Sequence, residues 1–221
     1  LPGTGGMASQ PAFGAVRPYF GMMVAGWLLY AAATLGSSLE AGLRGGVLLS
    51  AAWNDLAVRA FVALVVLPVA LAHSVRVLPM FLALSAAFWP VRAGAYAYLI
   101  SAGLVLVPEA LAMRGLEVEP LRRIAGLGLA GRGAVLLWVT WKLDVLTRRR
   151  PVERPARFLF TGPDRAPTRP GLPDFGEFGR FERLVYSAYV WLVLAAGCEV
   201  LNGGALLLGR PALVAPTIVR H

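Results

Sequence analysis

The class of fold is decided by a run of nineteen uncharged residues, Pro18-Tyr-Phe-Gly-Met-Met-Val-Ala-Gly-Trp-Leu-Leu-Tyr-Ala-Ala-Ala-Thr-Leu-Gly36. The hydrocarbon core of a bilayer is crossed by a single helix of about 20 apolar residues. Over the 221 residues, 57% are hydrophobic and only 15% are charged, and the mean hydropathy is +0.66. Soluble proteins carry about 25% charged residues. The sequence therefore predicts an all-α, polytopic transmembrane helical bundle.

Further apolar windows, bounded by charges or by glycine and proline, predict four more spans. They cover residues 56–84, 93–112, 121–146 and 184–201. The first of these windows is too long for one straight helix, and we expect Pro68 and Pro79 to kink or break it. A last stretch, Ala205 to His221, contains Pro211 and Pro216. We expect it to form a partial sixth segment, so the prediction is five spans plus a partial sixth.

The chain is expected to have four parts. Residues 1–17 form a lead-in that resembles a tag or the start of a fragment, and residues 18–147 hold four spans. Residues 148–182 contain six prolines and eight arginines, which predicts a solvated basic loop without a core. Residues 183–221 hold the fifth span and the partial sixth segment. Because loops rich in arginine stay in the cytoplasm, we expect this loop and the N-terminus on that side.

The charge balance and the cysteine count exclude several classes of protein. The formal net charge is +9, from 21 basic and 12 acidic residues. Its concentration in one inter-helix loop favours membrane topology over nucleic-acid binding. A single cysteine, Cys198, excludes an intrachain disulfide and a CxxC metal site within this chain. With no cation beside it in the sequence, Cys198 is expected to be a buried, inert thiol.

The most informative polar residues lie in the window at residues 56–84. His73 and Arg76 are three positions apart and share a helix face, and Arg59, fourteen positions before His73, falls near the same face of a regular helix. An imidazole between two guanidinium groups could hold a metal or haem iron while the arginines bind an anion. The alternative is that Arg76 reaches the membrane interface and His73 only bonds a nearby carbonyl. Met80 is a weaker candidate ligand, because methionine in an apolar run usually packs.

Arg132 lies in the middle of the fourth window, inside a GxGxxG pattern that begins at Gly126. No strand precedes it, so we reject a dinucleotide site. Gly126, Ala130 and Gly133 instead predict a face for close helix packing, and Arg132 is expected to point towards an acidic group, a propionate or water. Glu109 and Glu199 could each partner an arginine inside the membrane. The favoured interpretation is that both face water at the interface.

Several stretches together resemble the second half of the NnrS family. They are the Ser74-Val-Arg76-Val-Leu-Pro79-Met-Phe81 run, the arginine-rich loop after the Trp-rich fourth span, the Phe181-Glu-Arg-Leu-Val-Tyr186 helix and the closing Val219-Arg220-His221. The resemblance implies a bacterial inner-membrane protein that binds haem and copper and responds to nitric oxide. It implies roles for His221 and Arg76, and it suggests that this chain needs a missing half or another membrane subunit to complete a metal site.

Three interpretations of function stay open. The first is a haem- or copper-binding protein in which His73 and His221 are metal ligands and Arg59, Arg76 and Arg132 bind propionates, with nitric oxide as a ligand. The second is half of a transporter for an anionic small molecule, in which arginines line the path and prolines mark discontinuous helices. The third is a non-catalytic membrane assembly subunit whose small-residue faces serve helix packing. Whether the protein is an enzyme is left open.

Overall fold

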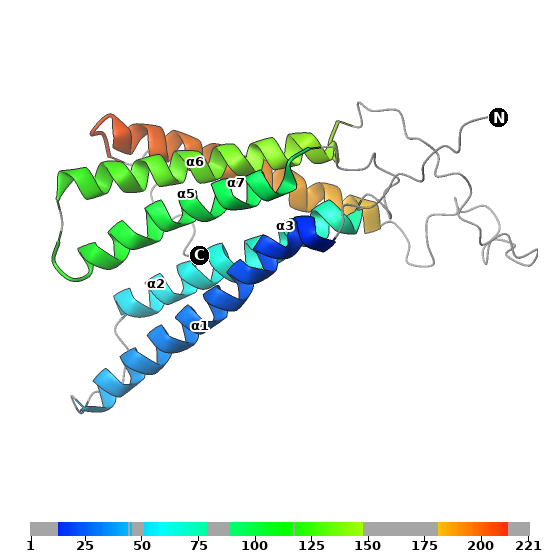
Figure 1. The fold of residues 1–221 in the computed structure, drawn as a ribbon. Helices are drawn as coiled ribbons and strands as arrows, with labels where there is room; N and C mark the ends of the chain where they lie inside the picture. Colours follow the sequence, from blue (N-terminus) through cyan, green and yellow to red (C-terminus); the bar gives the residue numbers. More distant parts are fainter. Residues whose placement is uncertain are drawn as a thin grey trace, which may run out of the picture.

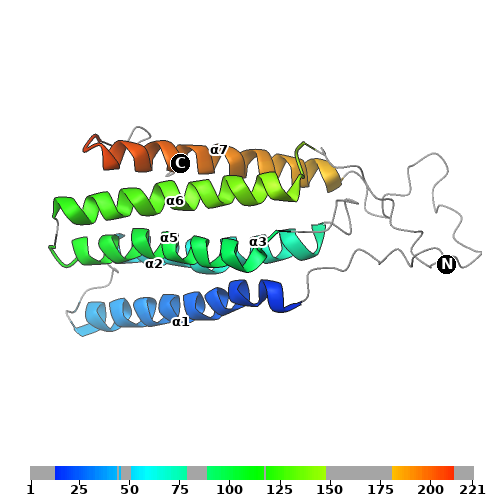
Figure 2. The ribbon, with the colours of Figure 1, turned by 45° about the horizontal axis from the view of Figure 1, so that its top comes forward.

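The computed structural model describes residues 13–43, 45, 51–78, 89–116, 118–147 and 181–211. This part of the chain folds into helices that run side by side as five rods (Figures 1 and 2). The elements in chain order are α1 (Phe13–Leu43), α2 (Ala51–Phe61), the π-helical segment η1 (Val62–Val66), α3 (Leu67–Arg76), α5 (Val91–Ala112), α6 (Glu119–Leu143) and α7 (Phe181–Leu207). Each of the five rods, with α2, η1 and α3 counted as one, is long and apolar enough to cross a membrane. The predicted membrane class and the five spans are therefore supported by the fold.

The first and the last rods are much longer than the predicted spans. The first has 31 residues, and its polar residues do not end it because their side chains bond to the helix's own carbonyls. Thr34 Oγ1 donates to the Tyr30 carbonyl at 2.8 Å, and Ser38 Oγ donates to the Thr34 carbonyl at 2.8 Å. Likewise α7 continues through Leu207, so residues 205–207 belong to the fifth rod. Residues 208–211 follow α7 as a turn and irregular chain, and the rest of the expected sixth segment, at 212–221, lies outside the described residues.

The second rod contains the predicted perturbation at Pro68, although it is a change of helical pitch and not a break. Helix α3 begins with Pro68 in its first turn, immediately after η1. The Leu67 N–H bonds to the Val62 carbonyl, five residues back instead of four. This wider turn lets the helix continue past a proline ring that would collide with the carbonyl four residues before it. Pro79, the second predicted break, lies outside the described residues.

Glycines set the contact between α6 and its neighbours. A Cβ placed on Gly203 of α7 would lie 2.5 Å from the Gly126 carbonyl oxygen, and a Cβ on Gly133 would lie 2.5 Å from the Ala196 carbonyl oxygen. On its other side, a Cβ on Gly128 would lie 2.8 Å from the Val105 nitrogen in α5. Only glycine permits this separation, and the predicted packing face of small residues is confirmed. Helix α6 therefore packs closely against both α5 and α7.

Two groups of rods meet at α5. Helix α1 packs along α2, η1 and α3, while α6 and α7 form the most extensive helix pair, and α5 touches both groups (Figures 1 and 2). We call the end where α1, α5 and α7 begin the near end, and the opposite end the far end. The shared core contains fully buried Val16, Val75 and Val139. Most other large apolar side chains on α1 and α7 point outwards, as lipid-facing residues do.

Candidate functional site

The centre of the candidate site is an ion pair between α6 and α7. Arg132 Nε donates to Glu199 Oε2 at 2.9 Å, and Arg132 Nη2 donates to Glu199 Oε1 at 2.7 Å. The side chains are only 14% and 23% exposed, and Arg132 lies midway along α6. A two-pronged guanidinium–carboxylate contact is the strongest form of ion pair in proteins. The expectation that Arg132 points to an acidic group is confirmed, and the interpretation of Glu199 as a water-facing interface residue is wrong.

The π-helical turn places an unusual acceptor beside this pair. In the register of η1, the group that would donate to the Ala63 carbonyl is the backbone nitrogen of Pro68, which has no hydrogen. Tyr98 of α5 supplies the missing bond, since its hydroxyl donates to the Ala63 oxygen at 2.7 Å. Tyr98 is fully buried. The Tyr98 side chain of α5 therefore supplies the hydrogen bond that the proline in the second rod cannot donate to the Ala63 carbonyl.

Tyr98 lies between the π-helical turn and the Arg132–Glu199 pair. It lies within electrostatic range of Arg132, Glu199 and Tyr19, which come from α6, α7 and α1. The helix contacts agree, because Gly131 lies against Ser101 of α5, one turn from Tyr98. We call Tyr98, Arg132 and Glu199 the middle layer. A π-helical turn, an intramembrane ion pair and a buried tyrosine meet there, and the first two of these features are common at functional sites.

A second group of charges lies closer to the far end, where α2 meets α5. Arg59 Nη2 bonds to Asp55 Oδ2 at 2.6 Å, and Arg59 Nη1 bonds to Glu109 Oε1 at 3.1 Å. These side chains are 46%, 42% and 30% exposed in the order Arg59, Asp55, Glu109. Glu109 is also within electrostatic range of Arg132. Glu109 thus has an arginine partner, as the less favoured interpretation allowed, and it also borders the open far end of the bundle. We call Asp55, Arg59 and Glu109 the far layer.

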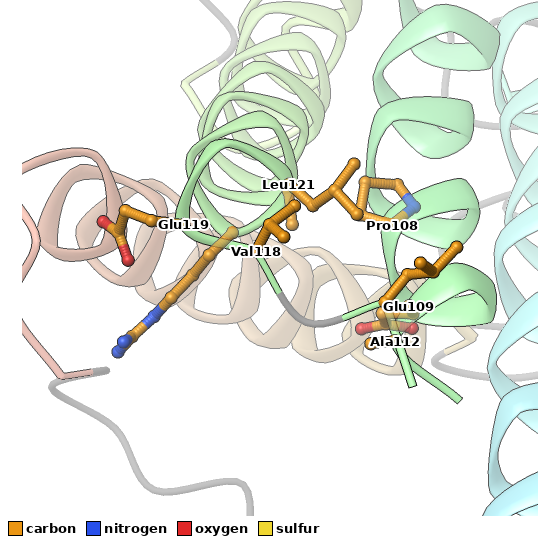
Figure 3. Close-up of a pocket in the computed structure, with 9 residues that line it drawn as sticks. Pro108, Glu109, Ala112, Val118, Glu119 and Leu121 are labelled. Carbon is orange, nitrogen blue, oxygen red and sulfur yellow. The ribbon is translucent and has the colours of Figure 1, made fainter. Parts of the chain in front are cut away.

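A shallow pocket of about 450 Å³ opens beside Glu109 at the far end of α5 and α6. Figure 3 shows Pro108, Glu109 and Ala112 of α5 facing Val118 and Leu121 across it, while Glu119 points away. The complete lining consists of Pro108, Glu109, Ala112, Leu116, Val118, Glu119, Leu121, Arg122 and Ala125. The pocket is an open approach from the far surface to the Glu109 carboxylate, which pairs with Arg59.

The structure does not bring His73 and Arg59 onto one face. His73 is exposed near the end of α3, whereas Arg59 turns to Asp55 and Glu109. The reason is the π-helical turn between them, which adds a residue and rotates the two positions by roughly 100° relative to a regular helix. The His73 ring nitrogen Nδ1 lies 3.2 Å from the Val69 carbonyl oxygen, which is the contact that the alternative interpretation of His73 expects. Arg76, partly buried, follows on the last turn of α3 and has interactions of its own.

The remaining candidates differ in outcome. In the described part of the chain, no group of three or more His, Cys, Asp or Glu side chains is arranged to hold a metal ion. His221 and Met80 lie outside the described residues. Cys198 is exposed, so the prediction of a buried thiol is wrong. Its neighbour Glu199 faces α6 because the two residues are about 100° apart around the helix.

Sequence reasoning did not identify Tyr98 as part of a site, and it gave the pairing of Glu199 with an arginine only as the less favoured alternative. A signal for the pairing existed, because an arginine and a glutamate within apolar windows each need a partner inside the bundle. Tyr98 had no such signal, since its role depends on which carbonyl Pro68 leaves open on another rod.

The chain was compared with known proteins at three levels. No family model, no curated protein and no solved structure matches it. The middle and far layers are therefore interpreted from their own chemistry.

Proposed function

We propose that this chain is part of a membrane transporter for a small anionic solute, with Arg132 as the group that binds the anion. The observation that carries the proposal is the Arg132–Glu199 pair in the middle of the bundle, beside the π-helical turn. Charges held in the middle of transmembrane helices typically mark paths for ions and solutes. Transporter sites also lie where a helix departs from regular geometry near the bilayer midplane.

The pair suggests how an anion would bind. The guanidinium group presents two N–H groups to Glu199 in a planar fork, and a solute carboxylate or other planar oxyanion matches the same fork. An arriving anion would take the place of Glu199 as the partner of Arg132, and the Glu199 carboxylate would be released from the pair. Arg59 would meet the anion earlier, beside the pocket at the far end. Both arginines are held by carboxylates, so each is positioned before a solute arrives.

The proposal is tested with full-length protein reconstituted into lipid vesicles. The probes are acetate, nitrate and inorganic phosphate, each supplied as a radiolabelled gradient, and uptake is compared with protein-free vesicles. Uptake of at least one probe is expected to exceed the protein-free rate at least tenfold. In the Arg132→Lys variant it should fall tenfold or more, because an ammonium group keeps the charge and lacks the planar fork. If none of the three anions enters faster than in protein-free vesicles, the proposal fails.

A matched control lies on the same helix. Arg123 forms an i,i+4 pair with Glu119 at 3.3 Å, and these side chains are 61% and 50% exposed. Arg123→Lys makes the same chemical change outside the middle layer and should leave uptake unchanged. Equal losses in both variants would mean that the effect is a general effect of charge and would refute a specific role for Arg132.

The second candidate function is binding of haem or copper in a response to nitric oxide, as the NnrS resemblance implies. One observation favours it: if His73 Nδ1 carries its proton towards the Val69 carbonyl, the nitrogen Nε2 is left on an exposed face as a metal ligand. Arg76 lies one turn away for a propionate. The other ligand would come from His221 or from another subunit of the bacterial inner membrane.

An optical spectrum tests this candidate. Purified full-length protein is measured oxidised and dithionite-reduced, with metal analysis of the same sample, for wild type and His73→Ala. A Soret band that shifts on reduction and disappears in the variant would support haem binding at His73. A colourless, metal-free full-length protein would refute it.

A further inference from the structure

A third set of polar groups lies towards the near end. Four buried groups there have no hydrogen-bond partner among the residues that the structure describes: the hydroxyls of Tyr19, Thr140 and Tyr189 and the indole N–H of Trp89. Their residues are at most 8% exposed. Ser74 is buried as well, and its hydroxyl donates to the Ala70 carbonyl at 2.6 Å. We call these five residues the near layer.

Helix register places the near layer at one level of the bundle. Gly126 of α6 lies against Gly203 of α7, and Gly133 lies against Ala196. The two helices run in opposite directions, so moving seven residues forward along α6 corresponds to moving seven residues back along α7. The next such step pairs Thr140 with Tyr189. The Tyr189 hydroxyl lies near the Ser74 hydroxyl, but the two do not meet hydrogen-bond geometry.

The same register argument holds for α1. A Cβ on Gly26 would lie 2.7 Å from the Leu64 Cβ. Tyr19 and Leu71, each seven residues from this contact towards the near end, both belong to the buried core, and Leu71 is less than one turn from Ser74. Tyr19 is also within electrostatic range of Tyr98. Hydroxyl groups from α1, α3, α6 and α7 thus share one level, and Tyr98 connects that level to the middle layer.

A buried hydroxyl without a partner is costly, and native proteins rarely keep several of them close together. Ordered water is the usual partner of such groups, since it can both donate and accept. An anion fits less well, because the buried carboxylate of Asp144 lies one turn after Thr140 on α6. The chemistry of the layer, with neutral hydroxyls and one nearby carboxylate, matches water.

We infer that the near layer binds ordered water and forms the near half of the solute path, joined to Arg132 through Tyr98. The inference that the near layer is part of a solute path rests on the proposed transport function. The inference that the layer binds water rests only on the hydroxyls without a hydrogen-bond partner. The path then has two chemically different halves. The far half is charged and the near half is neutral and hydrated, so an anion released from Arg132 enters a region that can solvate it without holding it tightly.

Hydration is tested first, with full-length protein in lipid vesicles. Water-edited solid-state NMR measures how fast water magnetisation reaches the Tyr19 and Tyr189 rings, with the Val139 methyl groups as a fully buried apolar reference. We expect transfer to both rings to be several-fold faster than to Val139. Transfer to both rings as slow as to Val139 would overturn the inference.

The melting temperature Tm of tyrosine variants gives a second, independent test of hydration. Tyr19→Phe and Tyr189→Phe remove one oxygen each and keep the shape of the ring. If the hydroxyls bind water, each change lowers Tm; if they are dry, removing an unsatisfied hydroxyl raises Tm. Tyr96→Phe, on the exposed face of α5, is the control and should not move Tm. A Tm that is unchanged or raised in both buried variants would also overturn the inference.

The path role is tested by uptake of the anion that the wild type transports. The double variant Tyr19→Phe/Tyr189→Phe should slow uptake several-fold while the affinity of the purified protein for that anion stays unchanged, because Arg132 is intact. Wild-type uptake rates in this variant would overturn the path role. If the wild type moves no anion, the proposed function fails, and the NMR and Tm results still decide whether the layer is hydrated.

Discussion

The Arg132–Glu199 pair should show strong energetic coupling. Replacing either residue by glutamine leaves the other charge buried in the bundle, at side-chain exposures of 14% and 23%. Removing one partner of a buried ion pair costs about 3 kcal/mol or more, and the two charge-assisted bonds at 2.7 and 2.9 Å support a value of that size. The double variant carries no unpaired charge, and its two amides can bond to each other. We therefore expect it to be no less stable than a single variant.

The prediction is a coupling energy of about 3 kcal/mol in a double-mutant cycle. The free energy of unfolding is measured by circular dichroism during titration of mixed micelles with sodium dodecyl sulfate, for wild type, Arg132→Gln, Glu199→Gln and the double variant. The exposed pair Arg123–Glu119 on the same helix provides the parallel cycle, with an expected coupling of about 0.5 kcal/mol or less. Additive effects at Arg132 and Glu199, equal to those at the exposed pair, would refute the argument that the pair is a buried unit.

Three further predictions concern the packing and the topology. Tyr98→Phe should lower the free energy of unfolding by about 1–3 kcal/mol, because it leaves the Ala63 carbonyl without a hydrogen-bond donor. Adding Pro68→Ala restores a backbone N–H at that point and should recover part of this loss. If the double variant recovers nothing, Tyr98 does not act through the Ala63 carbonyl. Gly203→Ala should destabilise the α6–α7 pair by about 1–3 kcal/mol in the same titration, whereas Gly204→Ala, with open space around its Cβ, should not; equal effects would contradict the close approach. Arg114→Cys in a Cys198→Ser background should react with an impermeant maleimide only from the side opposite the cytoplasm, and labelling from the cytoplasmic side would reverse the predicted topology.

The number of rods could be predicted from the sequence because each is a long apolar window with charges at its ends. The ends themselves could not, since the apolar run stops at Gly36 while α1 continues to Leu43, with Ser38 bonded to a carbonyl of the same helix. The charge at Arg132 was also visible, and its need for an acidic partner follows from the cost of an unpaired charge in lipid.

The choice of partner was not predictable from one sequence. Glu109 and Glu199 both lie towards one end of their spans, and only the packing of α7 against the glycines of α6 brings Glu199 to Arg132. The face of Arg59 was mispredicted for a related reason. A single π-helical turn rotates the side chains before it around the helix axis relative to the side chains after it. In a rod that is apolar on most sides, the hydrophobic periodicity of the sequence gives no clear sign of such a turn.

The same ion pair constrains how the protein is made. Arg132 and Glu199 are 67 residues apart, so the ribosome delivers α6 to the translocon well before its partner helix exists. An arginine at the centre of a helix opposes insertion by about 2.5–3.5 kcal/mol. During that interval the Arg132 guanidinium lacks the carboxylate that pairs with it in the bundle. Stable insertion of α6 is therefore expected to depend on the arrival of α7, the last described helix.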